Sequence, residues 1–288
     1  MVDVQAPIER KGTPFFGEHR HWMRWLVASP VLILLLLILA ALFAPQLATH
    51  DPVKPVPAEK LQPPSSEHWF GTDSFGMDVY SRVLYATRTD LTVAVLSVLL
   101  GVLIGLPLGA FSGYVGGWFD EGLMRVTEIM QAFPQILFAM AVIAALGNTL
   151  VNVVLILAFL NIPVYVRMVR SVTLPLRESD FVLAARCAGH IPLSLVLKHI
   201  VPNTLVPVFS QFSLSCAYAV QMVAGLSFIG LGVRVPEPEW GSMINLGASY
   251  IVFGIWWPAL FPGLATFLAA FALNGLGNRI RQAVLRES

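Results

Sequence analysis

SDFVLAARCAGHIPLSLVLKHIVPN, residues Ser179–Asn203, is a proline-punctuated island with charged side chains between two long apolar stretches. Ser179 suits a helix N-cap, and Asp180 favours the positive end of a helix. The alanines that follow are strong helix formers, and Gly189 suits a left-handed C-terminal stop. The pattern therefore predicts a short helix over residues 180–188.

Two prolines shape the second half of the island. Pro192 is placed to start a second helix, which we expect to run toward Pro202, so the segment is predicted to fold as helix, turn, helix. Helix chemistry alone does not separate a docking loop from an ordinary connector between spans.

Composition indicates an integral membrane protein. Hydrophobic residues make up 56% of the chain and charged residues only 12%, against about 25% charged in a typical soluble domain. The apolar residues come in blocks close to the roughly 20 residues that a helix needs to cross a bilayer. The blocks are too long for strands and do not alternate, so we predict an all-α fold. The six predicted spans are Leu26–Ala44, Leu91–Gly113, Leu123–Leu146, Leu150–Val169, Thr204–Ser227 and Ile251–Leu273.

The distribution of lysine and arginine predicts the orientation, because these residues accumulate in cytoplasmic loops. With both termini in the cytoplasm, thirteen basic residues lie inside and five outside, and the Ser179–Asn203 island is cytoplasmic. The outer five are Lys54, Lys60, Arg82, Arg88 and Arg234. The basic residues are scattered along the membrane borders, which argues against a nucleic-acid-binding face.

The chain divides into two predicted parts. Residues 1–90 comprise a cytoplasmic N-terminus, the first span and an external loop, and residues 91–288 form a five-helix core with a cytoplasmic loop at 170–203. The external loop, residues 46–88, is polar and rich in proline, so we expect it to be extended and without a core of its own.

The sequence lacks the residue patterns of several enzymes and metal sites. None of the four lysines follows a glycine, so a phosphate-binding P-loop is excluded. No G-x-S-x-G elbow occurs, and no histidine spacing matches a zinc site; the His19 and His21 pair is typical of a solvated tail. We therefore predict neither a catalytic residue nor a metal site, and a membrane-bound enzyme is disfavoured.

Several motifs resemble one family. Ala184-Ala185, Gly189 and Pro202 are spaced as in the EAA signature of the membrane subunits of bacterial ABC importers. The tail KHIVPN resembles the peptide and nickel branch of that family, and the likeness covers nearly the whole chain. The signature's leading glutamate is Leu183 here, so a salt bridge from that position is not expected. The other matching runs are HWFGTD (68–73), GMDVYSR (76–82), LSFIGLG (226–232) and PEWG (238–241).

The resemblance implies a non-catalytic permease in the bacterial inner membrane. It would form half of a pathway for di- or oligopeptides, together with a related second permease, two ATP-binding subunits and an external solute-binding protein. ATP and Mg²⁺ would bind the partner subunits, and this chain would bind no cofactor. The short helix would couple ATP hydrolysis to transport through Asp180, Phe181, Leu183, Ala184, Ala185, Arg186, Ala188 and Gly189.

Polar residues within or near the spans are candidates for lining the pathway. Gln131, Gln211 and Gln221 are such residues, although interhelical hydrogen bonding is the commoner role of a glutamine in a span. A secondary transporter driven by ions is the alternative function. It is disfavoured because the central parts of the spans hold essentially no ionisable side chains.

Overall fold

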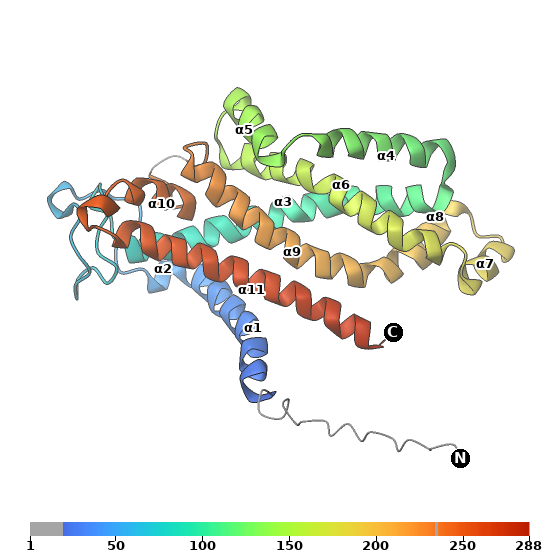
Figure 1. The fold of residues 1–288 in the computed structure, drawn as a ribbon, viewed down its shortest axis with the longest axis horizontal. Helices are drawn as coiled ribbons and strands as arrows, with labels where there is room; N and C mark the ends of the chain where they lie inside the picture. Colours follow the sequence, from blue (N-terminus) through green and yellow to red (C-terminus); the bar gives the residue numbers. More distant parts are fainter. Residues whose placement is uncertain (1–19, 234–235, 288) are drawn as a thin grey trace, which may run out of the picture.

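The computed structural model describes residues 20–233 and 236–287, and it confirms the all-α prediction. Among the described residues, β-type pairing is confined to one isolated bridge between Thr72 and Asp78. Four long helices, α3, α6, α9 and α11, run along the long axis of the molecule (Figure 1). The loops before α3 lie with α10 (Trp240–Ala248) at one end, and the predicted coupling segment lies at the other.

Helix α3 (Val79–Val115) begins well before the predicted span. The Asp78 carboxylate accepts a hydrogen bond from Ser81 N at 2.8 Å, which caps the first turn. Val79 and Ala86 are fully buried in that part of the helix. The prediction that residues 79–88 belong to an extended loop was therefore wrong, because a capped and buried helical turn precedes the apolar run.

Helix α3 packs closely against α6 (Leu150–Leu176) through a stripe of glycines. A Cβ at Gly105 would lie 2.7 Å from the Tyr165 Cβ, and a Cβ at Gly109 would lie 2.5 Å from the Val166 carbonyl oxygen. Small residues at this spacing let helix backbones approach each other closely. Helix interfaces in membranes are rich in such residues, because lipid supplies no hydrophobic driving force and van der Waals packing must hold the helices together. The stripe consists of Gly101, Gly105, Gly109 and Gly113.

We expect Gly109→Ala to destabilise the folded chain by about 1–3 kcal/mol, because the added methyl meets α6 backbone that has nowhere to move. Thermal unfolding of the purified protein in detergent measures the effect. Gly225→Ala is the matched control, since a Cβ at Gly225 meets nothing within 4 Å. Equal unfolding temperatures for the two variants would contradict close packing of α3 on α6.

The second half of the island does not form a separate helix. Helix α8 (Pro192–Leu195) and a π-helical turn (Val196–Ile200) continue directly into α9 (Val201–Phe228). Pro202 falls in the first turn of α9. Proline has no N–H to donate, and the wider π-helical turn that precedes it accommodates the lost hydrogen bond. The fifth span is thus a helix that extends from the island itself.

The third predicted span is broken. Helix α4 (Gly117–Ala132) and helix α5 (Gln135–Leu146) meet at an angle of 82°. Phe133 is extended because the following Pro134 disfavours helical geometry at the preceding residue. The pair counts as one span only if the bend lies within the membrane.

Helix α11 (Trp257–Glu287) starts six residues later than the predicted sixth span, Ile251–Leu273, and ends fourteen residues beyond it. A 3₁₀ turn (Ile251–Phe253) ends at Gly254, whose φ of 81° stops the helix there.

Four described helices are long and apolar enough to cross a membrane, or five if α4 and α5 count as one. Helix α1 (Arg20–Leu42) has a shorter apolar part, Ser29–Leu42, and the side chains of residues before Ser29 lie outside the described part. The prediction of six spans therefore stays a prediction. A short helix, α2 (Ala44–Leu47), follows α1, and a 3₁₀ turn (Pro57–Glu59) interrupts the loop between α2 and α3.

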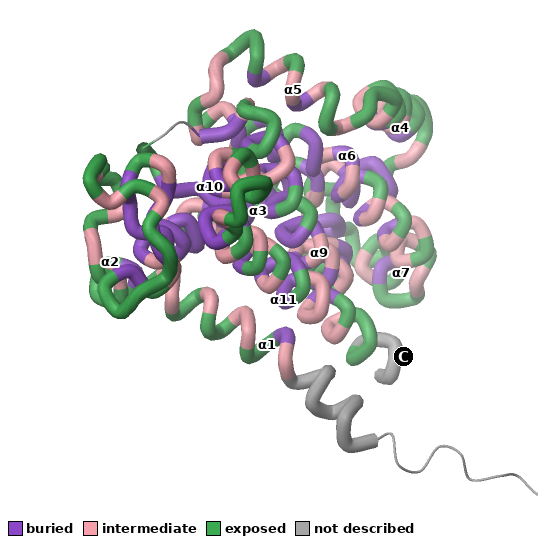
Figure 2. The backbone as a smooth tube through the Cα atoms, turned by 60° about the vertical axis from the view of Figure 1, so that its left-hand side comes forward, coloured by how far each residue is buried: buried purple, intermediate pink, exposed green. Residues whose placement is uncertain are grey.

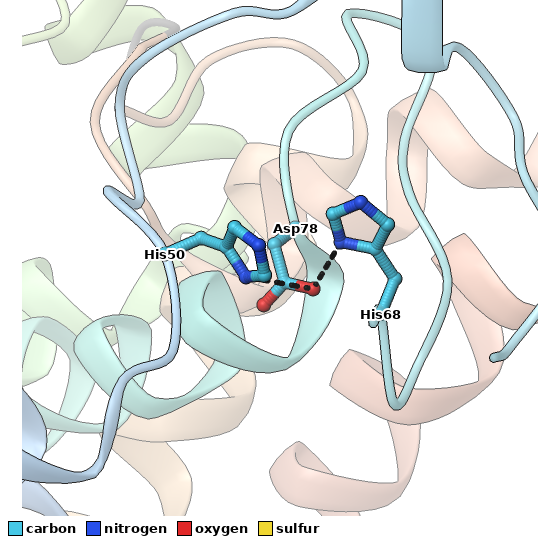
Figure 3. Close-up of side chains that lie close together, drawn as sticks. All are labelled: His50, His68 and Asp78. Atoms are coloured by element: carbon cyan, nitrogen blue, oxygen red, sulfur yellow. Dashed lines mark hydrogen bonds and ion pairs between the residues drawn. The ribbon is translucent and has the colours of Figure 1, made fainter. Parts of the chain in front are cut away.

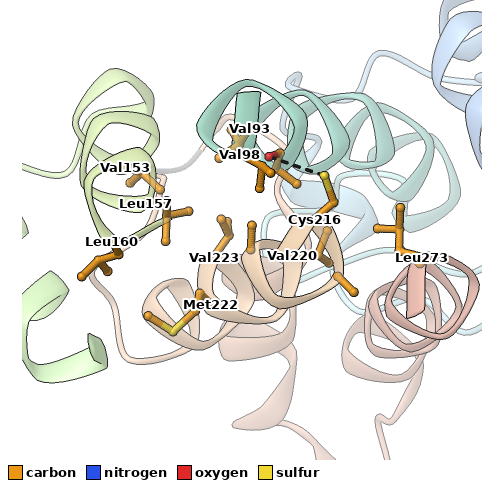
Figure 4. Close-up of a cluster of buried hydrophobic side chains, with 14 of the residues drawn as sticks. Val93, Val98, Val153, Leu157, Leu160, Cys216, Val220, Met222, Val223 and Leu273 are labelled. Carbon is orange, nitrogen blue, oxygen red and sulfur yellow. Dashed lines mark hydrogen bonds between the residues drawn. The ribbon is translucent and has the colours of Figure 1, made fainter. Parts of the chain in front are cut away.

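The core lies where α3, α6, α9 and α11 meet. Figure 4 shows Val98 of α3, Leu157 of α6, Val220 of α9 and Leu273 of α11 converging on it. Buried residues fill the middle of the bundle, whereas α4 and α5 are largely exposed along one side (Figure 2). Lipid or a partner must cover these exposed apolar faces.

Buried polar groups help to hold the end of the molecule that carries α10. Arg82 is fully buried, and its Nη1 donates to the carbonyls of Pro52 at 2.7 Å and Pro236 at 3.0 Å. Its Nε lies 3.4 Å from Asp73 Oδ2. Burial raises the pKa of Asp73, while the Met77 N–H and the Arg82 charge lower it. Arg82 thus joins three segments that are far apart in the sequence.

A second buried group lies at the start of α10. The Glu239 carboxylate accepts hydrogen bonds from Gly241 N and Ser242 N, both at 2.7 Å, and Asp90 of α3 accepts one from Trp240 N at 3.0 Å. Burial raises the pKa of Glu239. The PEWG run therefore caps α10 and fastens it to α3.

Candidate functional site

The predicted coupling helix exists as α7 (Asp180–Cys187). Gly189 has a φ of 86°, which is the left-handed conformation expected after the helix end. Ser179 has the extended backbone of an N-cap, but its hydroxyl donates to the Leu176 carbonyl at 2.5 Å instead of capping α7. The prediction of a serine side-chain cap was therefore wrong, because the end of α6 competes for the hydroxyl.

One side chain of helix α7 is buried against the rest of the chain, and most of the others are exposed to solvent. Val182 is fully buried, so it anchors α7 on its own chain. The side chain of Arg186 stacks over the Tyr114 ring at 5.6 Å, which adds a second attachment to the end of α3. Among the predicted coupling residues, Ala185 is half-buried, and the exposed ones are Asp180, Phe181, Leu183, Ala184, Arg186, Ala188 and Gly189.

Apolar side chains are exposed along the whole segment after α6. Phe181 is 44% and Leu183 37% exposed, and the stretch following α7 adds Ile191 at 65% and Leu193 at 56%. These four residues form an exposed apolar strip along the segment. Phe181 and Leu183 belong to the predicted coupling residues. Ile191 and Leu193 do not, because their exposure depends on how α8 packs.

Charged contacts brace the helices that carry α7. Arg170 of α6 forms two hydrogen bonds with Asp120 of α4, the one from Nη2 measuring 2.6 Å, and Ser112 of α3 donates to the same carboxylate at 2.5 Å. Arg177 donates to the Gly113 carbonyl at 3.2 Å. These contacts join the ends of α3, α4 and α6 next to α7.

An open groove of about 310 Å³ lies between α5, α6 and α9. Its polar lining includes Gln135, Asn161, Gln211 and Tyr218 among leucines and a valine. The Tyr218 hydroxyl donates to Gln135 Oε1 at 2.7 Å. Polar groups that converge in an otherwise apolar groove are typical of a site for a small solute.

The three predicted pathway residues do not lie together. Gln211 lines the groove, whereas Gln131 accepts a hydrogen bond from Arg167 at 2.5 Å and Gln221 is exposed elsewhere on α9. The sequence analysis missed Gln135 and Tyr218. Gln135 lies just after the bend between α4 and α5 and faces α9. Pro134 indicates a break at this point, but the direction in which α5 then runs is not encoded locally.

Known proteins resemble this chain over nearly its whole length. The family described as "Binding-protein-dependent transport system inner membrane component" matches residues 105–286. A dipeptide transport system permease protein of Alkalihalophilus pseudofirmus is 39% identical over 254 residues, covering 88% of this chain and 83% of the relative.

Two further relatives come from other bacteria. A probable D,D-dipeptide transport system permease protein of Escherichia coli is 40% identical, covering 97% of this chain and 94% of the relative. A glutathione transport system permease protein of Pectobacterium atrosepticum is 39% identical, covering 94% of this chain and 91% of the relative. The chain therefore belongs to the inner-membrane permease components of binding-protein-dependent ABC transport systems.

Proposed function

We propose that this chain forms half of the translocation pathway of an ATP-driven importer for di- or oligopeptides. The observation that carries the proposal is the short helix α7 with the two residues that follow it, because seven of the eight predicted coupling residues there are exposed to solvent. An isolated helix of this length is marginal in water, so a surface of this kind is expected to pack on a partner. The partner we propose is an ATP-binding subunit.

Coupling follows from the attachments of α7. Closure of two ATP-binding subunits would displace α7, and Val182 would carry the displacement into the bundle. Because Arg170 and Asp120 lock α6 to α4, the helices would move as rigid bodies and open the groove between α5, α6 and α9 to one side of the membrane.

The remaining components belong to the same proposal. A related second permease would complete the pathway, and an external solute-binding protein would deliver the peptide. ATP and Mg²⁺ would bind only the partner subunits, since this chain has no P-loop. Peptide is the proposed substrate class because relatives are named for dipeptides, D,D-dipeptides and glutathione.

Reconstitution tests the proposed function. We expect no ATP hydrolysis by the purified chain alone, and hydrolysis by the full complex in vesicles that rises when peptide-loaded binding protein is added. Peptide uptake should stop when ATP is withheld from the compartment that holds the ATP-binding subunits. ATP turnover by the isolated chain, or uptake driven by an ion gradient without ATP, would contradict the proposal.

Six spans with both termini in the cytoplasm are part of the proposal, supported by the thirteen-to-five division of basic residues. In a variant without Cys187 and Cys216, a cysteine at exposed Ser66 should react with an impermeant maleimide in cells with a permeabilised outer membrane. A cysteine at exposed Gln282 should react only after lysis. Equal labelling of both before lysis would exclude this topology.

A further inference from the structure

Three side chains at the outer end converge although they come from separate segments. His50 lies after α2, His68 lies in the HWFGTD run, and Asp78 immediately precedes α3. One ligand atom from each lies within 4.8 Å of the others. Figure 3 shows the two imidazole rings on opposite sides of the Asp78 carboxylate. We propose that His50, His68 and Asp78 bind a divalent transition metal of the Zn²⁺ type.

The Asp78 carboxylate is the centre of the cluster, and its Oδ1 is the oxygen that faces both imidazole rings. Its Oδ2 is already used by Ser81 N, whereas Oδ1 lies 3.0 Å from His68 Nδ1 and 3.9 Å from His50 Nδ1. Ligand atoms around a tetrahedral zinc with bonds of about 2.0–2.1 Å lie roughly 3.3 Å apart. The distances of 3.0 and 3.9 Å from Asp78 Oδ1 lie on either side of that value, and the ligand atoms, which lie within 4.8 Å of one another, would draw together around the ion.

A second carboxylate orients the buried histidine. His68 is only 2% exposed, and its Nε2 lies 3.3 Å from Glu59 Oε2, on the side of the ring away from Asp78. In the structure His68 Nδ1 forms a hydrogen bond with Asp78 Oδ1, and a bound ion would replace the proton of that bond. The ring proton would then sit on Nε2, where Glu59 Oε2 is near enough to accept it. A carboxylate that holds a histidine in this way is the usual support of a metal-ligating imidazole, and Glu59 is thus a positioning residue.

The segment that carries His50 is fastened to α3. The Ser81 hydroxyl accepts hydrogen bonds from Thr49 N at 3.2 Å and from His50 N at 3.1 Å. The His50 ring remains partly open to solvent, with a side-chain exposure of 36%, which leaves an entry path.

The surrounding cavity favours a cation. It has a volume of about 320 Å³, and Asp51, Glu59, Glu67 and Asp78 line it against one lysine, Lys54. Two imidazoles and one carboxylate suit Zn²⁺, whereas Ca²⁺ and Mg²⁺ prefer oxygen ligands throughout. Three protein ligands leave one position for water. The bound ion would join the outer loop to the first turn of α3.

The test uses the full chain with a histidine-free affinity tag, stripped with a chelator in detergent and titrated with Co²⁺ and then Zn²⁺. We expect one tightly bound equivalent, a visible tetrahedral Co²⁺ spectrum that Zn²⁺ displaces, and a higher unfolding temperature with Zn²⁺. His50→Ala should lose the equivalent, and so should Asp78→Asn, which keeps an N-cap side chain. Glu59→Gln should keep the stoichiometry with an affinity about 10–100-fold lower.

The other four of the six histidines supply the controls. The variants His190→Ala/His199→Ala and His19→Ala/His21→Ala should each retain the equivalent. The proposal is overturned if the wild-type chain binds no saturable equivalent, if His50→Ala and Asp78→Asn bind as the wild type does, or if either control pair removes the binding. None of these outcomes depends on which solute the transporter carries.

Discussion

Uptake is expected to fall to background in a Gly189→Val variant while the chain still inserts and assembles with the second permease. Gly189 has a φ of 86°, and a Cβ there would meet nothing within 4 Å. The effect therefore comes from the backbone conformation, which a β-branched residue disfavours by at least about 1–2 kcal/mol, and not from a clash. Relief of that strain would reorient α7 relative to its partner.

Gly189→Asn is the matched control, because asparagine tolerates the left-handed conformation and should retain most of the uptake. Transport rates at equal expression, together with co-purification of the ATP-binding subunits, measure the effect. Equal uptake by the valine and asparagine variants would show that the conformation at this position is irrelevant to coupling.

A charge on the exposed face of α7 should have the same functional outcome by another route. Ala184 is exposed, so Ala184→Glu leaves the packing of this chain intact but places volume and charge at the proposed contact. Ala283→Glu, at an exposed position near the end of α11, controls for an added charge. Normal uptake by Ala184→Glu would mean that α7 is only a connector.

Arg82→Met is expected to give the largest loss of stability among single substitutions at the end of the molecule that carries α10. The variant removes both carbonyl contacts of Arg82 and leaves Asp73 buried without its cation. Breaking one partner of a buried pair costs about 3–5 kcal/mol. Thermal unfolding of the purified chain in detergent measures the loss.

Arg88→Met on the same helix is the control, because Arg88 is exposed and surface substitutions usually change stability by about 0.5 kcal/mol or less. The double variant Arg82→Met/Asp73→Asn should be more stable than Arg82→Met alone, since the uncompensated charge is gone. If Arg82→Met unfolds at the wild-type temperature, the three segments are not held together by this guanidinium.

Local signals in the sequence predicted the helices well and their ends less well. Helix α7 was predicted to within one residue because its start and its glycine stop act over a single turn. Helix α3 starts twelve residues before the predicted span because its first turns, capped by Asp78, are not part of the apolar run. Pro134 signals a break, but the 82° angle between α4 and α5 depends on how each helix packs on α6 and α9.

The sequence by itself determined the all-α membrane class, the family and the short helix between the fourth and fifth predicted spans. The class rests on composition, the family on motifs that can be read along the chain, and the short helix on interactions between residues close in the sequence. Only the tertiary structure decided that Arg82 is buried, that Gln135 and not Gln131 reaches the groove, and that His50, His68 and Asp78 meet. Residues in such contacts are far apart along the chain, so the sequence does not show that their side chains are close in space. The packing between helices and loops determines which side chains share a site.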